Sequence, residues 1–391
     1  MLNRLFILLI GTAFVGCGDS TDKLNGIWVS GDFNKSQAVI VIENGMWSEY
    51  VSGLPFRYEA SLDGEELTLG GDNLFTEEYE EKVHKVRFTN DSLFIINEEM
   101  DDFLFIRKNS SDISEIIISS SNGKIELPKV EFCGGDGIDS EHNIFIDKQN
   151  SIDRTVVIDE SEKKIEFLSS NEMRNPLHGN GLINLFIDEN VPYSYVKEVQ
   201  LQMRLSNNLR IRYVLDENEC ELNKDSTQLQ LNYLRVNLPY FVGILDDSLD
   251  ILLPPRPEAH EIKSENLFIV TLESADVFIL NDEKLNRKSF LNKLDSIVLN
   301  VPKYVLVYGF NENALFKDYL DFKVTFQNQL NVLRNDYSYN EFGVSYEKLS
   351  ATIGNDESIK ENYKHVKKKV PQRLMTIEDY EINKKLYEDA K

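Results

Sequence analysis

Residues 251–270, ILLPPRPEAHEIKSENLFIV, place a cluster of prolines directly before an apolar run of the kind that forms a β-strand. Pro254, Pro255 and Pro257 favour an extended and stiff spacer, because proline fixes φ and has no backbone N–H to donate to a helix or a sheet. The apolar run that follows Asn266 then begins a new folded segment. A hinge is therefore expected over residues 251–265, with folded modules on both sides.

The segment after the hinge alternates between strand and helix patterns. Strands are predicted at residues 266–270, 276–281 and 304–310, and an amphipathic helix at residues 288–299. A longer helix is predicted at residues 315–335, because its apolar residues recur with helical spacing. They are Leu315, Tyr319, Phe322, Phe326, Leu330 and Leu333. This pattern predicts an α+β module with an open sheet, whose exposed edges favour homodimerisation.

The segment before the hinge contains one clear strand–helix–strand unit. Residues 183–187 form a strand of the buried type, and Pro192 begins a helix at a position that suits proline. Val196, Val199 and Met203 fall on one face of that helix, and residues 209–215 form the next strand. The pattern predicts a β-α-β unit inside a second, less regular α+β module.

Short motifs follow one another in order from the proline cluster towards the C-terminus. They are Leu252-Leu253-Pro254-Pro255-Arg256-Pro257, Asn266-Leu267-Phe268, Gln327-Asn328-Gln329-Leu330, Leu333-Arg334, Phe342-Gly343, Tyr346-Glu347-Lys348-Leu349 and Pro371-Gln372-Arg373. Over residues 239–378 this order resembles the periplasmic part of ExbD/TolR-type biopolymer transport proteins, in a branch with an extended C-terminus. In that branch two strands, a helix, a third strand and a long helix follow the proline stretch. The unit at residues 183–215, with a strand, an acidic turn with asparagine, a helix and a second strand, resembles the same module more weakly.

The resemblance implies a periplasmic module that dimerises and binds a partner peptide or the cell wall. ExbD and TolR proteins also carry a membrane helix with an aspartate that takes part in proton flow, and a carboxyl group in lipid is kept only at a high energetic cost. Residues 245–250, LDDSLD, precede the hinge here and are of strand or loop type. We therefore expect binding to ExbB/ExbD/TonB- or Tol-like envelope proteins, without a proton-conducting helix.

Residues 24–108 are predicted to be entirely β-structure. Short runs with alternating polarity recur along this segment and are separated by turn signals such as Asn44-Gly45 and Asp63-Gly64, which is typical of a small barrel or sandwich. The start of the segment, with Gly26 and Trp28, resembles the Gly-x-Trp start of lipocalin-like barrels. That resemblance implies that Trp28 closes the barrel base beneath Arg107 of the last strand. Two alternatives stay open, a barrel filled by side chains and a barrel that binds a small apolar ligand.

The first residues read as a targeting segment. Arg4 precedes an apolar run at residues 5–15, which has the length of a signal peptide and is too short to span a bilayer as a helix. Residues 14–17, FVGC, resemble a bacterial lipobox, and this implies cleavage before Cys17 and its lipidation. We expect a lipoprotein of the cell envelope, anchored in a membrane through an N-terminal lipid and facing the periplasm.

Composition excludes some classes of partner. The chain has 391 residues, which is too long for one ordinary core, and a formal net charge of −24. This charge opposes binding to nucleic acid, because the phosphate backbone is also negative. Besides Cys17 the chain has Cys133 and Cys220, and whether these two form a disulfide stays open.

The sequence contains no recognisable catalytic arrangement. The five histidines are scattered without the spacing of a metal site: His84, His142, His178, His260 and His365. No glycine-rich phosphate loop precedes a helix. We therefore expect a binding protein without catalytic residues, cofactor or metal. The main hypothesis is an accessory to, or a derivative of, an ExbB/ExbD/TonB-type transport energisation complex, and the alternative is a lipocalin-like lipoprotein that binds a small apolar ligand.

These inferences predict a multidomain chain, all-β at the N-terminus and α+β after it. The expected parts are a signal peptide at 1–16, a tether at 17–23, a lipocalin-like barrel at 24–108, a linker at 109–123, a mixed α+β module at 124–250, the hinge at 251–265, an ExbD-like α+β module at 266–357 and a charged tail at 358–391.

Overall fold

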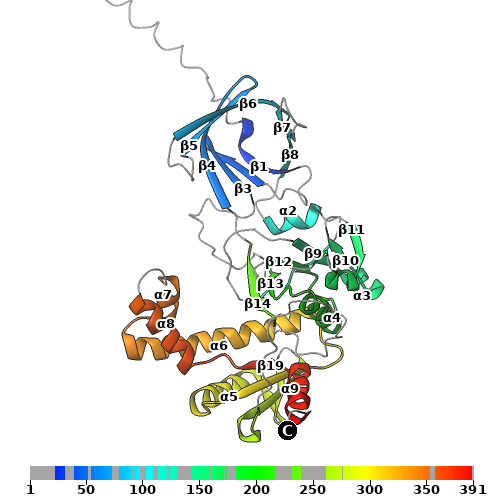
Figure 1. Ribbon diagram of the computed structural model, residues 1–391, viewed down its shortest axis with the longest axis vertical. Coiled ribbons are helices and arrows are strands. Elements are labelled where there is room, and N and C mark those ends of the chain that lie inside the picture. Colours follow the sequence, from blue (N-terminus) through cyan, green and yellow to red (C-terminus); the bar gives the residue numbers. More distant parts are fainter. Residues whose placement is uncertain are drawn as a thin grey trace, which may run out of the picture. The chain divides into compact units, whose positions relative to one another are not determined.

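The computed structural model separates the chain into two compact units (Figure 1). The smaller unit contains the N-terminal strands, and the larger unit contains the remaining sheets and most of the helices. The structure describes residues 23–30, 39–51, 54–72, 79–89, 92–96, 103–108, 113–120, 124–130, 142–158, 161–170, 172–173, 182–216, 231–238, 261–274, 276–352 and 357–389. Cys17, Cys133, Cys220 and the prolines of the expected hinge lie outside these residues.

The smaller unit is a closed barrel of eight antiparallel strands, in which each strand pairs with the next and β1 pairs with β8. The strands are β1 (Gly26–Ser30), β2 (Val39–Glu43), β3 (Met46–Val51), β4 (Leu54–Asp63), β5 (Glu66–Asp72), β6 (Tyr79–Phe88), β7 (Ser92–Ile96) and β8 (Phe103–Lys108). The predicted N-terminal barrel is thereby confirmed. Of the two predicted hairpin turns named above, Asn44-Gly45 has positive φ at both residues, and Asp63-Gly64 has positive φ at Gly64.

The barrel core follows from the alternation in the strands, because every second residue points inward. These inward residues form one apolar cluster that includes Trp28, Trp47, Leu67, Val86 and Phe105. The expected linker carries a helix, α2 (Ile113–Ser120), in which Ile117 is buried.

The first sheet of the larger unit has six strands in the order β11-β10-β9-β12-β13-β14. They are β9 (His142–Ile146), β10 (Thr155–Ile158), β11 (Ser161–Lys164), β12 (Ile183–Ile187), β13 (Arg210–Val214) and β14 (Tyr233–Asn237). Strands β9, β12 and β13 are parallel, and the other pairs are antiparallel. The connections include α3 (Lys148–Asp153), a 3-10 helix at Ile165–Ser169 and α4 (Tyr193–Leu205). The predicted helical face is correct, because Val196, Val199 and Met203 are buried.

The second sheet of the larger unit has five strands in the order β17-β16-β15-β18-β19. They are β15 (Leu267–Ser274), β16 (Val277–Leu280), β17 (Glu283–Asn286), β18 (Val305–Phe310) and β19 (Leu374–Thr376), with a short 3-10 helix at Ser264–Asn266. Its helices are α5 (Arg287–Asn300), α6 (Phe316–Phe342), α7 (Tyr346–Ala351), α8 (Glu357–Lys369) and α9 (Ile377–Asp389). The predicted strands and helices before residue 335 are found within a few residues of their expected positions.

Two features of the larger unit differ from the expected division. The modules expected at 124–250 and 266–357 share one hydrophobic core, which runs from Ile144 through Tyr213 to Val370. The charged segment after residue 357 contributes β19 to the second sheet. Leu374–Thr376, within the expected tail, are therefore fixed by pairing with β18. Among the described residues, no helix combines the length and the apolar character needed to cross a membrane.

Candidate functional site

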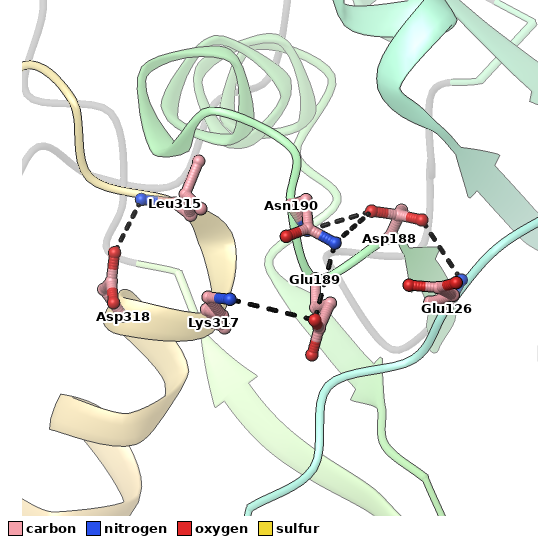
Figure 2. Close-up of polar contacts among 7 residues, drawn as sticks. All are labelled: Glu126, Asp188, Glu189, Asn190, Leu315, Lys317 and Asp318. Atoms are coloured by element: carbon pink, nitrogen blue, oxygen red, sulfur yellow. Dashed lines mark hydrogen bonds and ion pairs between the residues drawn. The ribbon is translucent and has the colours of Figure 1, made fainter.

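The turn that follows β12 is held by the carboxylate of Asp188 (Figure 2). One carboxylate oxygen, Oδ1, accepts a hydrogen bond from the backbone N–H of Asn190 at 2.9 Å, and Oδ2 accepts one from the backbone N–H of Glu126 at 3.1 Å. The carbonyl of Asp188 accepts a third bond from the N–H of Val191 at 3.0 Å. Because Asp188 is only 5% exposed, these bonds replace its lost hydration and fix the turn.

Glu189 connects this turn to two other segments of the larger unit. Its N–H donates to the carbonyl of Glu126 at 2.8 Å, and its own carbonyl accepts from the N–H of Lys317 in α6 at 3.1 Å. Its carboxylate also pairs with the Lys317 ammonium at 3.8 Å, as Figure 2 shows. The two side chains are 27% and 43% exposed, so the ion pair contributes little and the backbone bonds dominate.

A turn of the same kind follows β18. Asn311 Oδ1 accepts from the N–H of Asn313 at 2.8 Å, and the Asn311 amide donates to the carbonyl of Glu273 at 2.7 Å. The carboxylate of Asp318 accepts from the N–H of Leu315 at 2.9 Å and caps the start of α6. Unlike Asp188, Asn311 and Asn313 are exposed, so the tip of this second turn is open to solvent.

The two turns meet, and we call their contact the seam: residues 188–193 and 311–316. The N–H of Tyr193 donates to the carbonyl of Ala314 at 2.9 Å, and the N–H of Phe316 donates to the carbonyl of Val191 at 2.8 Å. These two bonds join the starts of α4 and α6. The exposed tip beside a rigid backbone contact makes the seam a candidate docking site, since binding residues commonly lie on loops that a scaffold positions.

A cluster of aromatic side chains lies directly under the seam. The rings of Tyr193 and Tyr319 stack at 4.5 Å, and Tyr213 and Tyr308 lie nearby in the same core. Burial raises the pKa of Tyr319 to about 12 and raises the pKa of the other three well above 10. All four hydroxyls therefore stay protonated at neutral pH, and the cluster acts as packing rather than as an acid or base.

Lys323 of α6 is a charged residue that lies against one of these rings. Its ammonium lies 5.5 Å from the centre of the Tyr308 ring, and desolvation lowers its pKa to about 8. An amine near neutrality can act as a nucleophile, but here no carboxylate, hydroxyl or histidine among the described side chains is hydrogen-bonded to it. A packing role follows from this geometry.

The three residues expected at the barrel base lie together. Trp28 and Arg107 are register partners on β1 and β8, and the guanidinium carbon lies 4.4 Å from the centre of the indole ring. Arg107 Nη2 donates to the carbonyl of Lys23 at 2.6 Å, and the Trp28 indole N–H donates to the carbonyl of Leu24 at 2.7 Å. Gly26 lies beside the Arg107 side chain with φ of 143°.

The sequence did not predict the seam, the tyrosine cluster or Lys323. One feature of the sequence could have indicated the seam. The pair Glu-Asn is present both in residues 188–190 (DEN) and in residues 311–313 (NEN). Across the described part of the chain, no three His, Cys, Asp or Glu side chains gather where they could hold a metal ion. No family model matches the sequence, and neither a curated protein nor a solved structure matches it.

Proposed function

We propose that the chain is a lipid-anchored interaction protein of the cell envelope, accessory to or derived from an ExbB/ExbD/TonB-type transport energisation complex. In this role the larger unit binds an envelope partner protein, and the lipid on Cys17 holds the chain at the membrane. The role is one of binding, since the segment before the hinge has no pattern of a proton-carrying membrane helix.

The order of strands and helices in the two sheets carries most of the proposal. In the first sheet a strand ends in an acidic turn with asparagine and leads through α4 into a parallel strand, which is the order that the ExbD/TolR resemblance implies for residues 183–215. In the second sheet β15, β16, α5, β18 and α6 follow in the order implied for the longer resemblance. These agreements support the proposal on both sides of residues 251–265.

Site-specific crosslinking in the native host tests the partner. A photoreactive residue at Glu312, on the exposed tip of the seam, should capture an ExbB-, ExbD-, TonB- or Tol-like protein. Glu65, in the exposed turn between β4 and β5 of the barrel, is the matched control and should capture less of it. If neither position captures such a protein, the proposed complex is wrong.

Lipidation is tested separately. Cys17→Ser should abolish labelling of the chain by radioactive palmitate and should release it from the membrane fraction, because one cysteine carries the whole anchor. Labelling that persists in the variant would contradict the anchor. Protease treatment of intact cells then separates a periplasm-facing chain, which is protected, from a surface-exposed chain, which is cleaved.

A second candidate function rests on one atom of the barrel. The Trp47 indole is 1% exposed in the barrel core, and its Nε1–H has no hydrogen-bond partner among the residues that the structure describes. An unpaired buried donor is costly, so a ligand with an acceptor beside its apolar body would be stabilised there. Native mass spectrometry of protein from its own host should then show an added mass, which Trp47→Phe reduces. A chain without added mass contradicts this candidate.

A further inference from the structure

The two sheets of the larger unit are built in the same way. In each, the first three strands in sequence pair antiparallel, while the first also pairs in parallel with the fourth and the fourth in parallel with the fifth. The orders are β11-β10-β9-β12-β13 and β17-β16-β15-β18-β19. Among the described strands, the order in the first sheet differs from that in the second by the added edge strand β14.

The register of the two sheets agrees as well. Ile187, the last residue of β12, lies opposite Ile146 of β9, and Phe310, the last residue of β18, lies opposite Leu272 of β15. The next residue in each case donates its N–H to the carbonyl of that opposite residue, at 2.9 Å and 3.3 Å. Because register shifts independently of strand order, this agreement is a second sign of equivalence.

The turns that follow these strands repeat one hydrogen-bond pattern. Asp188 Oδ1 accepts from the N–H of Asn190 at 2.9 Å, and Asn311 Oδ1 accepts from the N–H of Asn313 at 2.8 Å. In both turns the carbonyl of the first residue accepts from the N–H three residues later, at 3.0 Å and 3.2 Å. The Glu-Asn pair recurs at the same two positions, so the turns correspond residue by residue.

The seam joins corresponding residues. Tyr193 and Phe316 are the first residues of α4 and α6. The N–H of Tyr193 donates to the carbonyl of Ala314, just before the cap of α6, and the N–H of Phe316 donates to the carbonyl of Val191, just before the cap of α4. Exchanging the two halves converts one bond into the other. This reciprocity is the mark of an isologous contact, in which one surface meets a copy of itself across a two-fold axis.

We propose that the larger unit is a single-chain pseudo-dimer: two copies of one module, paired through the seam. Pro192 and Leu315, the corresponding cap residues, form an antiparallel bridge at the centre of the contact. Tyr193 and Phe316 are 3% and 0% exposed there, so each copy buries the other's helix start. Arg204 and Asp379, 13% and 15% exposed, add an ion pair between the copies at 2.8 Å. One chain therefore supplies both partners, in place of the homodimer expected from the sequence.

A disulfide across the centre of the seam tests the proposal. In an antiparallel bridge of this type the two Cα atoms lie about 4.5 Å apart, which suits a disulfide. Pro192→Cys with Leu315→Cys, in a full-length chain that carries Cys133→Ser and Cys220→Ser, should form an intrachain bond under mild oxidation. The expected product runs as a monomer of raised mobility on a non-reducing gel, and either single-cysteine variant lacks it. An interchain product, or no product, overturns the proposal.

The mass of the unmodified chain is a second readout that does not depend on the variants folding. Native mass spectrometry of the full chain released from detergent should give the monomer, and a dimer would overturn the proposal. This outcome is independent of the partner complex, because a pseudo-dimer can exist whether or not Glu312 captures an ExbB- or TonB-like protein. A failed capture with a monomeric, crosslinked chain would reject only the proposed function.

Discussion

The ammonium group of Lys323 lies 5.5 Å from the centre of the Tyr308 ring, and desolvation lowers the pKa of this amine from 10.5 to about 8. Between these two pH values the unfolded chain binds more protons than the folded chain, so the free energy of unfolding rises with pH across that window. Below pH 8 both states carry the charge, and the folded state bears the full cost of desolvating it.

We expect Lys323→Met to raise the free energy of unfolding by about 1–3 kcal/mol at pH 7, and this gain to fade towards pH 10. Urea unfolding followed by circular dichroism over a pH series measures the difference between variant and parent. Lys317→Met, on the same helix, is the matched control and should lose less than about 1 kcal/mol, because its ion pair with Glu189 is partly exposed. A gain that is constant over pH would contradict the assignment.

Arg107 contributes to the barrel through two contacts of its guanidinium, the face of Trp28 at 4.4 Å and the carbonyl of Lys23 at 2.6 Å. Arg107→Met keeps most of the aliphatic stem and removes both contacts, so we expect the barrel to lose about 1–2 kcal/mol. Arg87→Met is the comparison, because the exposed Arg87 covers Phe94 at 4.7 Å and should lose less. Tryptophan fluorescence during urea unfolding measures both, and equal losses would count against a special role for Arg107.

Helix α6 ends at Gly343, whose backbone adopts the left-handed conformation. Its φ is 71°, its N–H donates to the carbonyl of Tyr339 at 3.0 Å, and an added Cβ would meet no atom of the described residues within 4 Å. The cost of Gly343→Ala is therefore purely a backbone cost, about 1 kcal/mol, and Gly343→Asn should recover part of it. Thermal unfolding by circular dichroism measures both variants. Glu341→Ala, exposed on the same last turn, should change stability by less than about 0.5 kcal/mol.

Elements with a local signal could be predicted from the sequence, and elements that depend on distant pairing could not. Helices α4 and α5 lie close to their predicted limits, because an apolar stripe is a property of the segment itself. Helix α6 continues past residue 335 because Tyr337 and Phe342 pack against α7 and α8. This tertiary contact leaves no apolar periodicity in the sequence of α6 from which the longer helix could be predicted. Strand β19 has three residues and exists only through β18. The seam could not be predicted from the sequence, because the repeated Glu-Asn pair is too short to identify two equivalent turns without their hydrogen bonds.

At the scale of the whole molecule, the two compact units carry different optical signals. Both tryptophans, Trp28 and Trp47, belong to the barrel core, so tryptophan fluorescence reports the smaller unit. All the described helices except α2 belong to the larger unit, so the helical signal in circular dichroism reports mainly that unit. Because each unit has its own hydrophobic core, we expect their unfolding transitions not to coincide.

The variants Arg107→Met and Lys323→Met test whether the two compact units unfold independently. Arg107→Met should move the fluorescence transition to lower urea and leave the circular-dichroism transition in place. Lys323→Met should shift only the circular-dichroism transition at pH 7, towards higher urea. Distant sites with no shared partners contribute additively, so the double variant should show both shifts at their single-variant size. If either substitution moved both transitions equally, the two cores would unfold as one cooperative system, and the division into two independently unfolding units would be wrong.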